Sequence, residues 1–225
     1  ALSLLPCDLQ RGDYRAGDCL ACRFGRRHVS LGGIVGRLFA VVFALFLVLA
    51  AYFVARGFGL YQDALAAKSL DEMAASIESR EGFTPIDQLP SLYLQSVVAV
   101  EAHRFFAHPG FDAIAKGRAL VNDLKAGSIV EGGSTITQQL AKNQFFTQEQ
   151  TLERKVAEVF MALNIERHFS KSEILELYVN SIYFGDGYEG VGEASQGYFG
   201  KAPSSLTDYE ATLLAGVPNA PSVYA

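Results

Sequence analysis

The chain has 225 residues and a formal net charge of -5; half of its residues are hydrophobic and 19% are charged. This composition is too apolar for a disordered chain, and the acidic balance argues against a nucleic-acid partner, which normally requires a basic domain. The length suits one globular domain with accessory segments.

The first predicted element is an apolar segment near the N-terminus. Residues 38–55, LFAVVFALFLVLAAYFVA, carry no charge and stand between Arg37 and Arg56. A segment of this length is typical of a transmembrane helix, and a buried core helix is the alternative. Residues 1–37 contain six arginines, whereas the next cation after Arg56 is Lys68. The positive-inside rule therefore predicts a single-pass cell-membrane protein with a cytoplasmic tail over 1–37 and an extracytoplasmic domain.

The predicted tail contains all three cysteines of the chain. Cys7, Cys19 and Cys22, with His28 after them, have a spacing that could supply ligands to one zinc ion. The alternative is a short tail with reduced, unpaired thiols. Because the cysteines all precede the membrane segment, the domain after it has no disulfide on which to depend.

After the membrane segment we expect a stalk over 56–84 and a mainly α-helical domain over 85–225. Residues 57–225 hold 12 Lys and Arg against 21 Asp and Glu, a net charge of -9. Ser170 and Thr207 each precede a Glu by three residues, directly before an apolar-periodic run, which is the pattern of a capping box. Apolar residues recur at helical spacing over 152–163. Glycines indicate loops at 126–133 and 184–192.

Glu101 is the first candidate catalytic residue. It interrupts an apolar stretch at the end of a predicted helix. A carboxylate in apolar surroundings is desolvated and becomes able to hold or take a proton near neutral pH. The alternative is a Glu that points to solvent from an amphipathic helix. Phe105 and His108 follow at a spacing that supports one face, although a lone His is more often structural.

Residues 131–143, EGGSTITQQLAKN, form a candidate anion site. Two glycines lead into a helix start at Ser134 and Thr135, where backbone N–H groups and two hydroxyls would seat a phosphate or pyrophosphate. A polar stripe that ends in a cation follows, and a solvated helix face is the alternative reading of it. The stripe consists of Thr135, Gln138, Gln139 and Lys142.

Two further passages carry polar residues. Arg154 and Glu158 lie one helical turn apart and could form an ion pair, with Lys155 alongside; such pairs are mostly structural. The Tyr- and Gly-rich passage over 171–195, which includes Asn180, has the character of a scaffold.

Together and in this order, these patterns resemble the peptidoglycan glycosyltransferases of glycosyltransferase family 51. The resemblance is to the monofunctional, membrane-anchored kind, related to the glycosyltransferase module of class A penicillin-binding proteins, and covers about residues 85–225. The family's first motif, Glu-Asp-x-x-Phe-x-x-His-x-Gly, is matched by Glu101, Phe105, His108 and Gly110. The other matches are residues 132–143, Arg154 with Lys155 and Glu158, Lys171 to Asn180, and Glu210 with the LLAGVPNAP that follows.

The resemblance implies a lysozyme-like helical domain behind a single N-terminal transmembrane helix. It also implies that lipid II is polymerised into β(1→4)-linked glycan strands, with inversion and release of undecaprenyl pyrophosphate. Glu101 would be the general base, and Glu158 would orient neighbouring cations or assist the acceptor. The implied substrate-binding residues are Phe105, His108, Gly133, Ser134, Thr135, Gln138, Gln139, Lys142, Arg154 and Lys155.

The resemblance has further implications for cofactors and partners. A divalent cation, Mg or Mn, would help the pyrophosphate to leave, and no organic cofactor is expected. The partners would be lipid II, the lipid-linked glycan strand, the membrane, and a separate transpeptidase with other cell-wall synthesis proteins. The candidates for a surface that dips into lipid are Phe111, Ile114, Leu120, Val121 and Leu124.

The sequence departs from the family at two places. Position 102 is Ala where the family usually has Asp, which removes one carboxylate beside the expected base. The sequence also stops at Ala225, soon after the fifth motif, and we expect the C-terminus to be truncated.

Two other functions stay open at this point. A muramidase or lytic transglycosylase also places one Glu on a lysozyme-like fold, but the phosphate seat with Lys142 argues against strand cleavage, which releases no pyrophosphate. A catalytically impaired, membrane-anchored cell-wall scaffold would explain Ala102. The presence of Glu101, Lys142, Arg154 and Glu158 argues against this scaffold.

Overall fold

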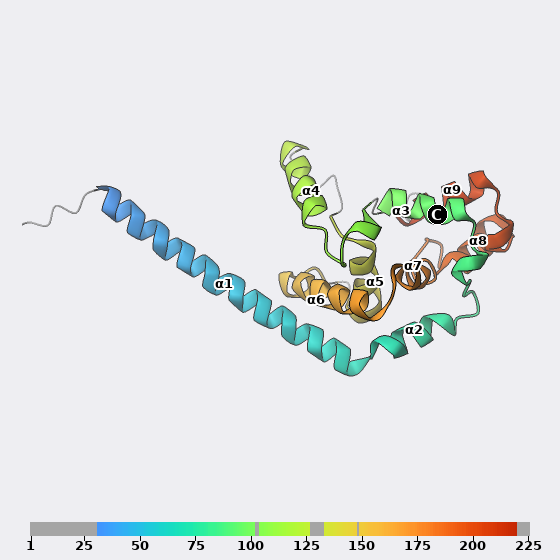
Figure 1. Ribbon diagram of the computed structural model, residues 1–225, viewed down its shortest axis with the longest axis horizontal. Helices are drawn as coiled ribbons and strands as arrows, with labels where there is room; N and C mark the ends of the chain where they lie inside the picture. Colours follow the sequence, from blue (N-terminus) through green and yellow to red (C-terminus); the bar gives the residue numbers. More distant parts are fainter. Residues whose placement is uncertain (1–30, 102–103, 127–132, 148, 220–225) are drawn as a thin grey trace, which may run out of the picture. The chain divides into compact units, whose positions relative to one another are not determined.

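The computed structural model describes residues 31–101, 104–126, 133–147 and 149–219 (Figure 1). It divides the chain into two compact units, residues 1–47 and 48–225. In the described residues every named element is helical, and one isolated antiparallel bridge joins Tyr183 to Glu189. The predicted mainly α-helical fold is therefore confirmed. The candidate zinc ligands Cys7, Cys19, Cys22 and His28 lie outside the described residues, as do Ala102, Gly132 and residues 220–225.

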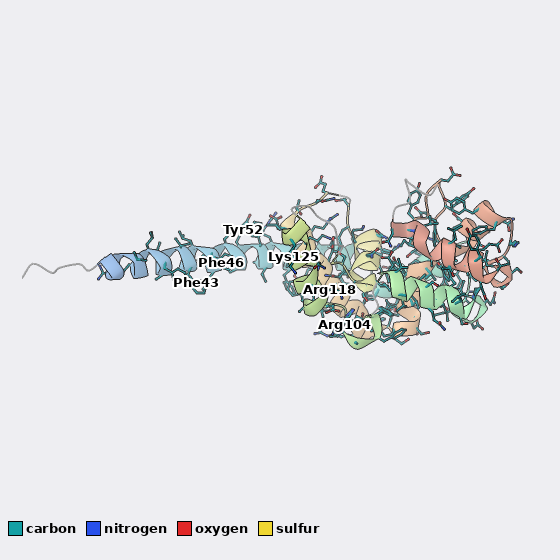
Figure 2. The ribbon with its side chains drawn as sticks, turned by 90° about the horizontal axis from the view of Figure 1, so that it is seen from above. Phe43, Phe46, Tyr52, Arg104, Arg118 and Lys125 are labelled. Carbon is teal, nitrogen blue, oxygen red and sulfur yellow. The ribbon has the colours of Figure 1, made fainter. Side chains whose placement is uncertain are left out.

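Helix α1, Leu31–Ala67, contains the predicted transmembrane segment. Its stretch Val35–Ala67 is long and apolar enough to cross a membrane, with a mean hydropathy of 2.8 over its most apolar window, none of which is buried. Figure 2 shows Phe43, Phe46 and Tyr52 projecting from this helix, and all three side chains are exposed. A core helix of a soluble protein would bury such side chains, so the alternative of a buried core helix is not supported. The helix anchors the chain in a membrane.

The last turns of α1 pack against α6, Leu152–His168. The ring centroids of Phe58 and Tyr61 lie 5.2 and 6.0 Å from that of Phe160. A Cβ atom placed on Gly57 would lie 2.6 Å from Cβ of Val156 and 2.8 Å from a backbone oxygen of α6. The two helix backbones therefore approach at Gly57 more closely than any residue with a Cβ allows.

The core of the second unit is built from short helices. The region predicted as a stalk contains the end of α1 and helix α2, Leu70–Glu78, which a capping box at Ser69 begins. Helix α5, Ile136–Phe145, packs against α6 and against α7, Lys171–Val179, while α3, Ser91–Glu101, packs against α9, Asp208–Gly216 (Figure 1). Helices α4, Ala113–Ala126, and α8, Val191–Phe199, and the short 3-10 turns Ile86–Gln88, Phe105–Ala107, Pro203–Ser205 and Val217–Asn219 complete the described elements.

Large apolar side chains from these helices and from the loop after α7 are fully buried, and each stabilises the fold by roughly 1.5–3 kcal/mol relative to exposure. They include Met73, Ile77, Tyr93, Ile136, Leu140, Met161, Ile165, Ile174, Phe184 and Leu214.

The local signals read from the sequence agree with the structure. Ser170 and Thr207 form the predicted capping boxes, because each hydroxyl accepts from the backbone N–H three residues on and each Glu reaches back to the cap. The predicted loop at 184–192 contains four residues with positive φ, at positions 185, 186, 187 and 190, where glycine stands at all but one. The loop predicted at 126–133 falls largely outside the described residues.

Asn180, at the C-terminal end of α7, holds a distant backbone segment. Its side chain accepts a 2.8 Å hydrogen bond from the Thr84 N–H and donates to the Thr84 carbonyl at 2.9 Å. One turn earlier, Glu176 accepts from the Ile86 N–H at 2.6 Å. The connector between α2 and α3 is therefore fixed to α7 by main-chain groups, which matches the scaffold role predicted for Asn180.

The close approach at Gly57 leads to a prediction about stability. Gly57→Ala should destabilise the fold by about 1–3 kcal/mol, because the new methyl group meets a backbone oxygen that cannot rotate away. Gly59→Ala is the matched control, since a Cβ at Gly59 meets nothing within 4 Å, and this change should stabilise the helix by roughly 0.5–1 kcal/mol. Unfolding of the detergent-solubilised protein measures both; equal stabilities for the two variants would contradict the packing described here.

Candidate active site

Three helices converge on the carboxylate of Glu101, which ends α3. Gln139, on α5, donates a 2.6 Å hydrogen bond from Nε2 to Glu101 Oε2. Tyr178, on α7, donates from its hydroxyl to Gln139 Oε1 at 3.3 Å. Burial and the nearby Glu101 carboxylate raise the pKa of Tyr178 well above its usual value, so the phenol stays protonated.

The surroundings of Glu101 differ from the sequence expectation. An apolar setting was expected from the neighbouring residues, but the structure leaves the side chain half-buried and gives it an amide partner. Local sequence could not show this, because Gln139 lies 38 residues further along the chain. A carboxylate held in this way has a fixed orientation, which a general base requires.

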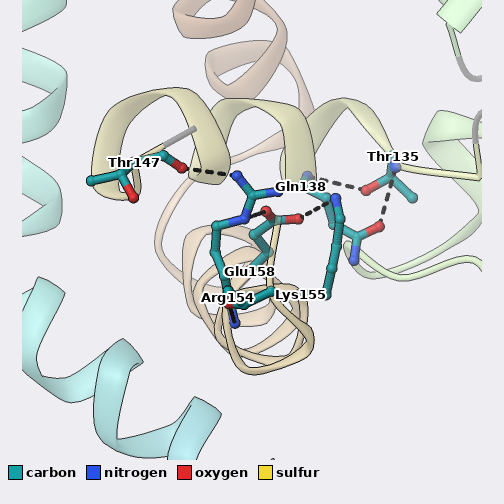
Figure 3. Close-up of polar contacts among 7 residues, drawn as sticks. Thr135, Gln138, Thr147, Arg154, Lys155 and Glu158 are labelled. Atoms are coloured by element: carbon teal, nitrogen blue, oxygen red, sulfur yellow. Dashed lines mark hydrogen bonds and ion pairs between the residues drawn. The ribbon is translucent and has the colours of Figure 1, made fainter. Parts of the chain in front are cut away.

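A second cluster surrounds Glu158 on α6 (Figure 3). Only 1% of the Glu158 side chain is exposed, and its two oxygens lie 3.0 Å from Arg154 Nε and 2.8 Å from Lys155 Nζ. Arg154 also donates to the Thr147 carbonyl at 2.8 Å. The ion pair predicted from the sequence is therefore present, and the buried carboxylate orients both cations.

Two more lysines share the electrostatic environment of this cluster. Burial, and then repulsion by Lys155, lower the pKa of Lys142 on α5, and Glu101 and Glu158 oppose that shift. Burial and repulsion by Lys155 likewise lower the pKa of Lys116 on α4. Because these cations disfavour one another, a bound anion of high charge would relieve their repulsion. Lys116 was not predicted from the sequence, since no local pattern connects it with residues 142–158.

The start of α5 is organised differently from the expected phosphate seat. Thr135 is its N-cap and forms a capping box with Gln138, and the Thr135 hydroxyl also donates to the Gly110 carbonyl at 2.7 Å. Thr135 and Gln138 are only 4% and 2% exposed. Their side chains are thus already hydrogen-bonded within the protein, whereas Gly133 and Ser134 remain half-buried at the entry to the helix.

Phe105 and His108 belong to a third group, on the segment between α3 and α4. Lys171 Nζ donates to the His108 carbonyl at 2.7 Å and lies 4.3 Å from the Phe105 ring centroid. Lys171 also pairs with Glu166, which accepts a short 2.5 Å bond from Thr137. This network fixes the loop to α5, α6 and α7.

The His108 side chain is buried. It is 8% exposed, and burial followed by repulsion from Lys171 lowers its pKa. Its Nδ1 atom has no hydrogen-bond partner. Glu166 was not predicted as a site residue, because its role depends on contacts with distant segments.

The described residues do not fit a protein-held metal ion. Among them, no group of three or more His, Cys, Asp or Glu side chains could hold one. The side chains gathered between Glu101 and Glu158 are mainly cations, which suit an anionic ligand.

A known protein family matches most of this chain. The family model described as Transglycosylase matches residues 68–225. The chain belongs to the transglycosylase family. This confirms the resemblance to glycosyltransferase family 51, and the matched region contains every residue of the candidate site described above.

Curated relatives of this transglycosylase chain are penicillin-binding proteins. Penicillin-binding protein 1F of Bacillus subtilis is 46% identical over 154 residues, which are 68% of this chain and 22% of that protein. Penicillin-binding protein 1A of Aquifex aeolicus is 50% identical over 142 residues, 63% of this chain and 20% of that protein. The chain thus spans about a fifth of the length of these relatives.

The buried Glu158 leads to a prediction. Glu158→Gln should destabilise the fold by about 3–5 kcal/mol, because it leaves the buried Arg154 guanidinium without a counter-ion. Lys155→Met should cost less than about 1 kcal/mol, since Lys155 is half-exposed and Arg154 keeps its partner. Chemical denaturation measures both variants. A Glu158→Gln variant as stable as Lys155→Met would show that the pair does not stabilise the site.

Proposed function

We propose that this chain is a peptidoglycan glycosyltransferase that polymerises lipid II into β(1→4)-linked glycan strands with release of undecaprenyl pyrophosphate. The observation that carries the proposal is the placement of an oriented carboxylate, Glu101, within the electrostatic range of Lys142, which belongs to a group of cations. The carboxylate can accept a proton, and the cations can bind a pyrophosphate. The family match and the penicillin-binding relatives support the same reaction.

In the proposed reaction Glu101 acts as general base. It removes the proton of the acceptor's 4-hydroxyl as that oxygen attacks C1 of the lipid-linked donor strand. The bond between C1 and the pyrophosphate oxygen breaks on the opposite face, which inverts the configuration at C1. The departing pyrophosphate carries the electron pair of that bond, and the positive charges of Lys142, Lys155 and Arg154 stabilise it.

Glu158 acts as an orienting residue in this proposal. Both of its oxygens lie against Arg154 and Lys155, so the carboxylate holds the cations that face the leaving group. Thr135 and Gln138 shape the start of α5 through the capping box, and Gly133 and Ser134 are the half-buried groups at that entry.

The membrane helix suits substrates that are themselves lipids. Residues 1–37 would lie in the cytoplasm and the domain outside the cell membrane, as the arginines before the helix indicate. Lipid II and the lipid-linked strand would then reach the domain from the same membrane. A separate transpeptidase and other cell-wall synthesis proteins are the further partners that we propose.

A divalent cation, Mg or Mn, is also part of the proposal. Since the described residues do not fit a protein-held metal, the cation would arrive with the pyrophosphate of the substrate. Polymerisation with and without EDTA tests this requirement.

The central test is polymerisation of labelled lipid II by the purified, detergent-solubilised protein. We expect wild-type protein to form polymer and Glu101→Gln to reduce the rate by about 100-fold or more, because the base is lost. Glu78→Gln, an exposed change of the same kind at the end of α2, is the control. Absence of polymer from folded wild-type protein would favour the scaffold, and cleavage of preformed strands would favour a muramidase.

Lys142 provides a separate prediction. Lys142→Met should lower the rate constant for polymerisation by about 10- to 1000-fold, because one cation near the leaving group is removed, and Lys142→Arg should recover part of it. Lys201→Met, which removes a cation paired with Glu210 elsewhere in the domain, is the control. Equal rates for Lys142→Met and the control would show that Lys142 does not act on the leaving group.

A further inference from the structure

The amide of Gln139 has one orientation that satisfies both of its neighbours. A Gln amide has a donating nitrogen and an accepting oxygen, so its two ends are not equivalent. The nitrogen points to Glu101 at 2.6 Å and the oxygen points to the Tyr178 hydroxyl at 3.3 Å. The three groups therefore form a hydrogen-bonded series from α7 through α5 to α3.

Tyr178 is well placed to set this orientation. It is 1% exposed on α7, among buried apolar side chains of the core that include Leu177 and Ile174. Burial keeps its phenol protonated, so the hydroxyl is available as a donor. A donor at this end of the amide selects the oxygen, and the nitrogen must then face the carboxylate.

We propose that Tyr178 is a positioning residue: its hydroxyl fixes the Gln139 amide so that the nitrogen faces Glu101, which favours the ionised carboxylate that can accept a proton. This inference rests on the proposed function, since it concerns the base of that reaction.

The physical reason is the effect of a half-turn of the Gln139 amide, which exchanges its oxygen and nitrogen. An amide oxygen against an ionised carboxylate is repulsive, whereas the same oxygen accepts a hydrogen bond from a protonated carboxyl group. Without the Tyr178 hydroxyl both orientations become accessible. A larger fraction of Glu101 is then protonated at a given pH, and the enzyme loses its base at a higher pH than before.

Other groups near Glu101 do not depend on Tyr178. Glu101 interacts electrostatically with Lys142 on α5 and opposes the lowering of the Lys142 pKa. Tyr93, from α3, acts on Tyr178, and the Tyr178 hydroxyl also interacts with Glu101 itself. The double variant described below separates this direct route from the route through Gln139. In the described part of the chain, Tyr178→Phe therefore removes one hydroxyl near Glu101 and leaves the other titratable and charged groups on these helices in place.

The test is the pH dependence of lipid II polymerisation by the detergent-solubilised protein. Tyr178→Phe should move the midpoint of the acidic limb upward by about 0.5–1 pH unit, while the rate on the plateau falls by less than about fivefold. Tyr198→Phe is the matched control, because it also removes a tyrosine hydroxyl that donates a hydrogen bond, here to the Phe184 carbonyl at 2.9 Å. Its profile should match that of wild type.

The role of Gln139 is tested by a double variant. Gln139→Leu alone should raise the acidic midpoint at least as much as Tyr178→Phe does. Adding Tyr178→Phe to Gln139→Leu should then cause no further shift, because Tyr178 acts through the amide. A further shift in the double variant would mean that the phenol acts directly on Glu101 and would overturn the proposal.

The two proposals fail in different ways. An active Tyr178→Phe variant with an unshifted acidic limb would overturn the positioning role and leave the glycosyltransferase intact. Wild-type protein that forms no polymer at any pH would instead overturn the proposed function.

Discussion

The buried carboxylate of Glu158 is the constraint on which the candidate site depends. The domain after the membrane segment has a net charge of -9, yet its site gathers cations around one point. A charge with 1% exposure is stable only if it is paired, and here each oxygen lies within 3.0 Å of a cation. Glu158 thereby makes a local positive site possible in an acidic protein.

Sequence alone predicted the features that depend on neighbouring residues. The apolar span, the capping boxes at Ser170 and Thr207, and the Arg154–Glu158 pair all follow from spacings of a few residues. It did not predict the partners of Glu101, Glu166 or Lys116, because these depend on how separate helices pack. The Thr135 hydroxyl was expected to face a ligand. Threonine also caps helices, and in the structure Thr135 is the N-cap of α5.

The packing of α1 connects the membrane helix with the site. Gly57 precedes the region matched by the family model, but it lies against Val156, between the two residues of the buried ion pair on α6. The same two turns of α6 therefore contact α1 through Val156 and hold the Arg154–Glu158 pair. A change at the end of α1 can reach Arg154 without any alteration of the catalytic sequence motifs.

The hydrogen bonds between Asn180 and Thr84 have a consequence for the order of folding. They join positions that are 96 residues apart, so the connector before α3 cannot be completed when it first leaves the ribosome. Contacts of such long sequence separation form late, because the chain must lose the entropy of closing a long loop before these contacts can stabilise it. Glu101 lies at the end of the helix that follows this connector. The placement of Glu101 would therefore be completed only after α7 has been synthesised and has docked.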